Sequence, residues 1–172
     1  SRKLDGVRCI CIIDDIGNVS FYSREGNEFL TLTILENEIK KLSLRNTVFD
    51  GELCIVDETG LEDFQGIIKQ INKKNHTILN PVYYIFDMIE LSDFNNQISK
   101  STLSERFDAL NNVFSEDVNS PNLRLLKQQK LKSIDEISKL MEEAENLGYE
   151  GLMLSNDSIY ENCSYPVRLL RS

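Results

Sequence analysis

The chain has 172 residues, of which 41% are hydrophobic and 27% charged, a composition typical of a globular domain that excludes a disordered tail. Its formal net charge of −9 excludes nucleic-acid binding by a uniformly basic surface, so any such role needs a local basic face or basic domains outside this chain. No apolar run approaches the roughly 18 residues that a membrane span needs, so we expect no membrane partner.

The first half of the chain is predicted to hold mostly strands. Its expected elements are strands over 7–13 and 19–24, a helix over 31–42, a strand over 47–57, a helix over 61–71 and a strand over 82–91. The segment 7–13 has apolar residues on both faces, which predicts a central strand. The turn "DDIGN" joins it to the next strand in a hairpin.

The second half is predicted from two capping boxes, in which a Ser or Thr is followed three residues later by Glu. Thr102 with Glu105 predicts one helix start, and Ser133 with Glu136 predicts another. The second helix has a one-sided apolar face and ends at Gly148. Strands are expected within 122–131 and over 151–156.

These elements favour the α+β fold class, with largely antiparallel sheets flanked by helices. Strands outnumber helices, several neighbouring strands are joined by tight turns, and no regular βαβ alternation appears.

The cysteines do not form a metal-binding pattern. Cys9, Cys11, Cys54 and Cys163 form no CxxC pair, and His76 is the only histidine, so no zinc site is expected. Cys9 and Cys11 share one face of a predicted strand and are expected in the core. Free thiols suit a reducing, intracellular setting.

Four short stretches place ionisable residues at predicted strand ends, where a rigid scaffold presents reactive groups. They are "KLDG" at 3–6, "SREG" at 23–26, "DGE" at 50–52 and "YEG" at 149–151. Each alone has a purely structural explanation, such as a solvated lysine or a common turn.

Together with "YYIFDMIE", and in this order, these stretches resemble the nucleotidyltransferase motifs of ATP-dependent DNA ligases. The matching residues are Lys3-Leu4-Asp5-Gly6 with Arg8, then Ser23-Arg24-Glu25-Gly26, Asp50-Gly51-Glu52, Phe86-Asp87, and Glu150-Gly151-Leu152-Met153. The resemblance spans nearly the whole chain. It implies that residues 1–172 are a fragment of an adenylation domain with an ATP-grasp-like nucleotidyltransferase core.

The resemblance also implies a reaction. Lys3 would attack the α-phosphate of ATP, release pyrophosphate and carry AMP as a phosphoramidate, because a neutral lysine amine is a nucleophile. The AMP would then pass to the 5′-phosphate of nicked duplex DNA, and the 3′-hydroxyl would displace it and seal the strand. Such an enzyme serves DNA replication and repair, and we expect it to be a monomer.

The remaining matched residues acquire roles by the same resemblance. Arg8 and Arg24 would contact phosphate and ribose oxygens, for which planar guanidinium groups are suited. Phe86 would stack on adenine. Glu52 would lie near the ribose and metal, and Glu150 would bind metal; Mg²⁺ needs only one or two carboxylates when phosphates and water complete its shell.

The chain departs from the family pattern in two places. Ser155 stands where a basic residue often follows the last matched motif. The family's final K-x-K motif is missing, and we expect the chain to stop just before it, unless Arg168 and Arg171 replace it. An oligonucleotide-binding (OB-fold) barrel and N-terminal domains with basic DNA-binding surfaces are expected outside this chain.

Other functions stay open at this point. An mRNA capping guanylyltransferase or an RNA ligase shares the covalent chemistry, although "SREG" and "EGLM" favour a DNA ligase. A non-catalytic nucleotide-binding domain is disfavoured by the intact Lys3, and an unrelated interaction protein would require chance motifs. Arg24, Phe86 and Glu150 also have structural explanations as a surface arginine, a core aromatic and a helix-end carboxylate. Asp87 has no assigned role.

Overall fold

The computed structural model describes residues 1–97, 99–115, 120–157, 159–160 and 167–171, the last range as backbone only. The strands are β1 (Arg2–Lys3), β2 (Val7–Ile13), β3 (Val19–Tyr22), β4 (Glu28–Phe29), β5 (Thr47–Ile55), β6 (Pro81–Glu90), β7 (Leu123–Leu125), β8 (Gly151–Ser155) and β9 (Val167–Arg171). The helices are α1 (Thr33–Lys40), α2 (Phe64–Gln70), α3 (Leu91–Asn96), α4 (Leu103–Val113) and α5 (Asp135–Asn146).

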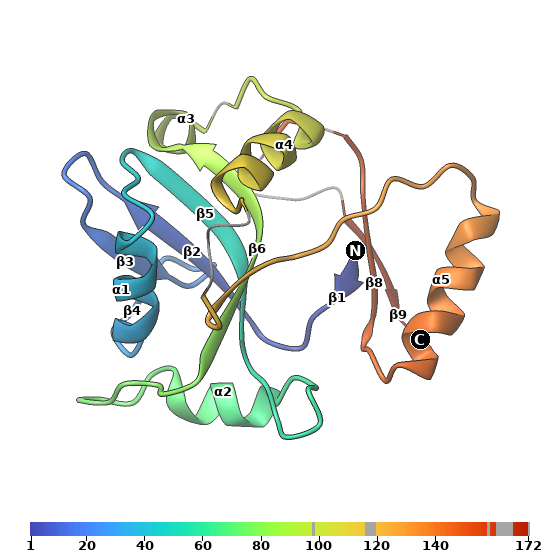
Figure 1. The fold of residues 1–172 in the computed structure, drawn as a ribbon, viewed down its shortest axis with the longest axis horizontal. Coiled ribbons are helices and arrows are strands. Elements are labelled where there is room, and N and C mark those ends of the chain that lie inside the picture. Colours follow the sequence, from blue (N-terminus) through green and yellow to red (C-terminus); the bar gives the residue numbers. More distant parts are fainter. Residues whose placement is uncertain (98, 116–119, 158, 161–166, 172) are drawn as a thin grey trace.

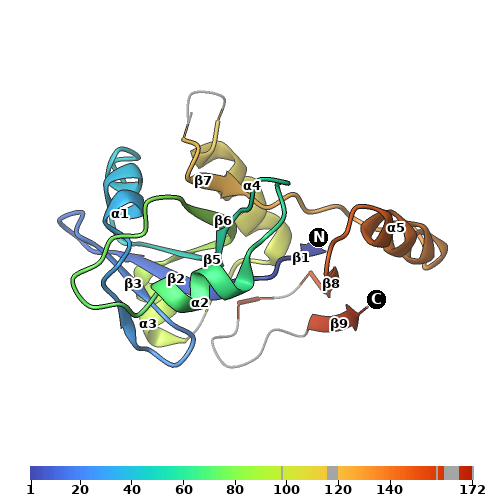
Figure 2. The ribbon, with the colours of Figure 1, turned by 90° about the horizontal axis from the view of Figure 1, so that it is seen from below.

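These strands form two sheets. The larger has the order β4-β3-β2-β5-β6-β7, and the smaller has the order β1-β8-β9. Among the paired strands, β6 and β7 run parallel and the other pairs run antiparallel. Figure 1 shows the small sheet beside the large one, with α5 on its outer side, and Figure 2 shows the same arrangement from below. The predicted α+β class with largely antiparallel sheets is confirmed.

The main core lies on one face of the large sheet. Side chains of a strand alternate between faces, and the alternate residues Cys9, Cys11 and Ile13 of β2 join this core. Helices α1, α2 and α4 cover the same face through Leu35, Ile67, Leu110 and their neighbours. The prediction that Cys9 and Cys11 are core residues is confirmed, since both are fully buried.

The opposite face of the large sheet carries a second, smaller apolar cluster. It comprises Leu4, Cys54 and Leu126, with Tyr84 and Phe86 packed against them. Tyr84 and Phe86 alternate along β6 with residues of the main core, so they point away from it. None of the residues in this second cluster belongs to a helix, and the candidate active site lies on this face of the sheet.

Two sequence predictions need correction. Ser133 and Glu136 do not form a capping box: α5 begins at Asp135 after Ile134, and no side chain caps it. The Glu136 carboxylate instead accepts a hydrogen bond from the backbone N–H of Lys132 (3.1 Å). The strand expected within 122–131 is confined to Leu123–Leu125.

The other capping box is confirmed, because Thr102 and Glu105 exchange both hydrogen bonds. The predicted apolar face of α5 is only partly covered, with Ile134 and Leu147 exposed. None of the helices among the described residues is long and apolar enough to cross a bilayer.

Candidate active site

A cavity of about 640 Å³ lies on the second face of the large sheet and is shared with the small sheet. Its volume is within the range of small-molecule sites. Its lining includes all six residues singled out from the sequence: Lys3, Arg8, Arg24, Glu52, Phe86 and Glu150. These six residues come from separate stretches of the chain, and the fold brings them together at one cavity.

Lys3 enters the cavity from β1, the short strand at the edge of the small sheet. Its cross-strand partner is Gly151 on β8. Because Glu150 immediately precedes that glycine, its carboxylate forms an ion pair with the Lys3 ammonium. The Lys3 side chain is 19% exposed and that of Glu150 36% exposed, so the pair lies at the cavity wall within reach of a ligand.

Arg8 and Glu52 are direct cross-strand partners on β2 and β5. The Arg8 guanidinium donates from Nε and Nη2 to the two carboxylate oxygens of Asp50, with 2.9 Å between Nε and Oδ1. It also lies 5.8 Å from the centre of the Phe86 ring. A bidentate contact fixes the plane of a guanidinium, so Arg8 is held in one orientation at the cavity wall.

Glu52 is the most strongly perturbed carboxyl group of the cavity. Its pKa is raised from 4.5 to about 7, chiefly by burial and also by the nearby carboxylates of Asp50 and Glu150, while Arg8 and Lys3 oppose the shift. Perturbed carboxyl groups in a cleft are characteristic of functional sites. Burial and the charge of Glu150 also raise the pKa of Asp5, which lines the same cavity.

Arg24 is presented by a tight turn after β3. The backbone N–H of Gly26 donates to the carbonyl of Ser23 (3.0 Å), and Gly26 has a φ of +89°, a conformation that glycine adopts without strain. The turn explains the "SREG" pattern and leaves Arg24 exposed at the rim of the cavity.

Phe86 is the extra residue of a β-bulge in β6. In the strand register Asp87 lies opposite Asp50 and Ile85 lies opposite Gly51, so Phe86 is one extra residue between two consecutive residues of β5. Gln128, from the segment after β7, donates its Nε2–H to the Phe86 carbonyl (2.8 Å). The bulge and this hydrogen bond position the ring at the cavity wall.

Gly51 lies on β5 beside the bulge, where the two strands pack closely. A Cβ atom at this position would lie 2.5 Å from the Tyr84 carbonyl oxygen and 2.6 Å from the Tyr83 ring. The "DGE" pattern thus combines a buried Asp50, a glycine required by close packing, and Glu52 in the cavity.

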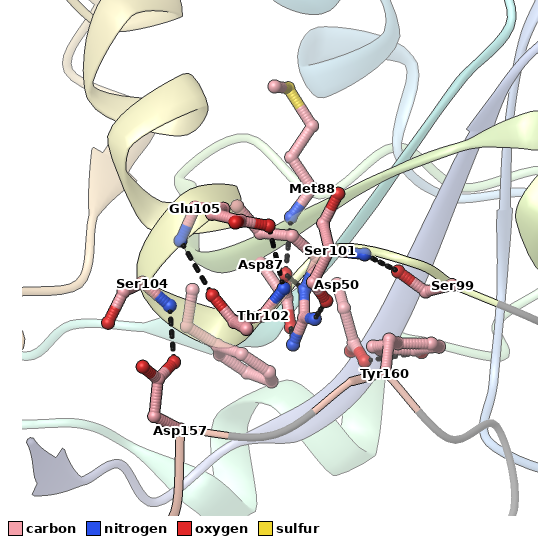
Figure 3. A network of polar contacts seen from close by, with 12 residues as sticks. Asp50, Asp87, Met88, Ser99, Ser101, Thr102, Ser104, Glu105, Asp157 and Tyr160 are labelled. Carbon is pink, nitrogen blue, oxygen red and sulfur yellow. Dashed lines mark hydrogen bonds and ion pairs between the residues drawn. The ribbon is translucent and has the colours of Figure 1, made fainter.

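Several polar residues near the cavity had no role assigned to them from the sequence. Asp87 is buried and bound by Arg106 of α4, with 2.7 Å between Arg106 Nε and Asp87 Oδ1. Tyr160 donates its hydroxyl to Asp50 (2.8 Å). Figure 3 shows Asp50, Asp87 and Tyr160 close together near Thr102, at the start of α4. Arg106 lies among apolar residues of a helix that was predicted to pack on the core. A charged residue in such a position indicates a buried ion pair, which was not predicted from the sequence.

Ser155, at the position where a basic residue is usual, also lines the cavity. The prediction that Arg168 and Arg171 replace the family's lysine motif depends on side chains that lie outside the described part of the structure. Cys163 also lies outside the described residues. Within the described residues, no cluster of three or more His, Cys, Asp or Glu could hold a metal ion unaided.

Comparison with known proteins agrees with this fold. The chain is 28% identical over 158 residues to a DNA ligase of African swine fever virus (strain Badajoz 1971 Vero-adapted), covering 90% of this chain and 35% of the relative. It is 30% identical over 159 residues to a DNA ligase of Archaeoglobus fulgidus, covering 88% of this chain and 27% of the relative. The chain thus spans about a third of the length of these curated relatives.

The fold is also similar to a solved structure, the ATP-dependent DNA ligase from bacteriophage T7 in complex with ATP. The TM-score is 0.68 at 18% identity, over 93% of this chain and 57% of that one. Residues 1–170 match the family described as the ATP dependent DNA ligase domain. Since that match covers almost the whole chain, the chain belongs to the family of ATP-dependent DNA ligase domains.

Proposed function

We propose that this chain is the adenylation domain of an ATP-dependent DNA ligase, and that Lys3 carries the covalent AMP. The observation that carries the proposal is the position of Lys3 at the wall of one cavity whose lining also includes Arg8, Glu52, Phe86 and Glu150. A nucleophile, phosphate-binding cations, an aromatic ring and carboxylates are the parts that adenylyl transfer from ATP requires.

In the first step the Lys3 amine forms a bond to the α-phosphorus of ATP while the bond from that phosphorus to the leaving pyrophosphate breaks. As the partner of Glu150 in an ion pair, Lys3 is an ammonium ion without a lone pair. Its proton must therefore leave before attack, and the Glu150 carboxylate, already in contact with the ammonium group, is placed to accept it. Positioning and charge stabilisation supply most of the acceleration in such transfers.

The other proposed roles follow from how each side chain is held. Arg8, fixed by Asp50, donates to phosphate or ribose oxygens, and Arg24 at the rim contacts the same substrate from outside. Phe86 offers its ring face to the adenine. The AMP then passes to the 5′-phosphate of nicked duplex DNA, and the 3′-hydroxyl displaces AMP and seals the nick.

The residues present fit Mg²⁺ bound jointly with the substrate. Glu150 is close enough to Glu52 to raise the pKa of the Glu52 carboxyl group, and Mg²⁺ takes one or two carboxylates plus phosphate oxygens and water. When bound, the ion neutralises charge that develops on the phosphate oxygens.

DNA binding by the whole protein is proposed to rest on further domains, including an OB-fold barrel. The net charge of −9 argues against a strong DNA surface on this chain alone. The relatives are about three times longer than the segment that this chain matches.

The test uses the full-length protein with Mg²⁺ and ATP radiolabelled at the α-phosphate. A label that survives denaturation, disappears in Lys3→Ala and is released by nicked DNA supports the proposal. Label retained by Lys3→Ala overturns the assignment of the nucleophile. Labelling by GTP in place of ATP would point to a capping guanylyltransferase.

A further inference from the structure

Tyr160 joins the segment after β8 to the large sheet. Its side chain is buried, and Figure 3 shows it beside Asp50. Two contacts fix the same segment to the start of α4: Asp157 Oδ1 accepts from the Ser104 backbone N–H (2.8 Å), and Ile159 forms a bridge with Thr102. This segment follows β8 of the small sheet, so the hydrogen bond from Tyr160 to Asp50 connects it to β5 of the large sheet.

The Asp50 carboxylate receives three of the hydrogen bonds at this junction. Arg8 donates from Nε and Nη2, and the Tyr160 hydroxyl donates to Oδ2 (2.8 Å). Asp50 is fully buried. A buried carboxylate is stable only when donors satisfy its oxygens, so the Tyr160 hydroxyl and the Arg8 guanidinium together define its orientation.

A buried ion pair adjoins the Arg8–Asp50 pair. Asp87 is the cross-strand partner of Asp50 and is bound by Arg106, whose guanidinium lies 5.8 Å from the centre of the Tyr160 ring. Tyr160 therefore contacts both ion pairs, one through its hydroxyl and the other through its ring. Burial and the charge of Asp50 raise the pKa of Tyr160, so the phenol stays protonated and remains a donor.

We propose that Tyr160 is a positioning residue: through Asp50 it holds the Arg8 guanidinium in the orientation that binds the nucleotide. Arg8 donates from Nε and Nη2 to both carboxylate oxygens of Asp50, so rotation of that carboxylate would turn the guanidinium with it. The proposal rests on the proposed function only for the role of Arg8 in nucleotide binding. The hydrogen-bonded chain from Tyr160 through Asp50 to Arg8 is independent of that role.

The first experiment is a double-mutant cycle in the full-length protein, with the KM for ATP in self-adenylation as the readout. Tyr160→Phe removes one hydrogen bond to a charged group and keeps the ring, so we expect the KM to rise about tenfold with little change in kcat. In an Arg8→Gln background the same change should alter the KM by less than about twofold, because coupled residues are non-additive. If Tyr160→Phe raises the KM for ATP by the same factor in the wild-type and Arg8→Gln backgrounds, the proposal is overturned.

Phe94→Leu is the matched control. Phe94 packs against the Tyr160 ring, with 6.4 Å between the ring centres, and its apolar side chain offers Asp50 no hydrogen bond. We expect this variant to lower the melting temperature and leave the KM for ATP within about twofold of the wild type. A KM increase as large as that of Tyr160→Phe would mean that loosening the segment, and not the hydroxyl, is responsible.

The second experiment does not depend on activity. NMR of the arginine Nε–H groups compares hydrogen exchange at Arg8 and Arg106 in the wild type and in Tyr160→Phe. We expect exchange at Arg8 to quicken about tenfold, with Arg106 much less affected. If the wild type forms no covalent label while Arg8 exchange still changes, the proposed function fails and the positioning link stands. If the label forms and neither the KM nor Arg8 exchange changes in Tyr160→Phe, the positioning link is wrong.

Discussion

Arg8 and Glu52 lie directly opposite each other on β2 and β5, yet the Arg8 guanidinium donates diagonally to Asp50. Arg8 shares its charge with the buried Asp50 and only partly offsets the cost of burying Glu52. This is why the pKa of Glu52 rises to about 7 although a cation stands beside it. The titration of Glu52 consequently falls in the neutral range, where both stability and nucleotide binding are measured.

Replacement of Glu52 should change how stability depends on pH. Because the folded-state pKa is raised from 4.5 to about 7, the folded chain holds this proton more tightly than the unfolded chain. The resulting stabilisation is complete below about pH 4.5 and is lost as pH rises through 7, a change of up to about 3 kcal/mol. Glu52→Gln removes it, so the variant should gain stability relative to the wild type as pH rises from 4.5 to 8.

Urea unfolding at pH 5, 6, 7 and 8 measures this difference. A free-energy difference between Glu52→Gln and the wild type that stays constant across the four pH values would contradict the assignment of the titration to Glu52.

The Arg106–Asp87 ion pair is expected to matter far more for stability than the ion pairs at the surface. Both side chains are almost fully buried. Arg106→Met removes the charge that neutralises Asp87 and should cost about 3–5 kcal/mol. Lys40→Met breaks the exposed pair with Glu36 and should cost less than about 1 kcal/mol.

The double variant Asp87→Leu with Arg106→Met separates the ion pair from the packing around it. It replaces both charges by apolar groups, so most of the lost stability should return. Urea midpoints of the three variants report these differences. A double variant no more stable than Arg106→Met alone would mean that α4 depends on the shape of the arginine and not on charge compensation.

Much of the site could be predicted from local patterns, because a strand alternates its faces and a motif occupies only a few residues. The strand periods of "VRCICII" and "VFDGELCI" place Arg8 and Glu52 on the same face, as the structure has them. The bulge at Phe86 has no such signal in the sequence "YYIFDMIE". The one-residue shift in the register of β6 depends on how β6 packs against β5. The Tyr160–Asp50 hydrogen bond spans 110 residues, and no local period reports a contact at that separation.

The failed capping box has a similar physical reason. The pattern Ser133-x-x-Glu136 is present, but the Glu136 carboxylate accepts from the Lys132 backbone N–H. The side chain of a Glu can reach more than one unpaired backbone N–H near the start of a helix. The pattern therefore predicts the first residue of α5 only to within two residues.

Gly51→Ala tests the close approach of β5 and β6. The added methyl group would meet the Tyr84 carbonyl and the Tyr83 ring, both inside the sheet, so we expect a loss of about 1–3 kcal/mol from overpacking. Gly26→Ala is the control, because open space surrounds Gly26 and only its positive φ opposes a side chain. It should cost about 1 kcal/mol. If thermal unfolding shows equal losses, steric contact at Gly51 is not the cause.

Gln128 should influence nucleotide binding through the bulge. Its Nε2–H donates to the carbonyl of Phe86, the extra residue of the bulge. Gln128→Glu keeps the shape, removes the donor and sets a carboxylate against a carbonyl oxygen, so the bulge should loosen and Phe86 should lose its fixed position. We expect the KM for ATP in self-adenylation to rise about fivefold to tenfold, as for one lost hydrogen bond. Gln129→Glu introduces the same charge at the exposed neighbouring residue and should leave the KM unchanged. If the KM rises equally in the two variants, the added negative charge is the cause and Gln128 does not position Phe86.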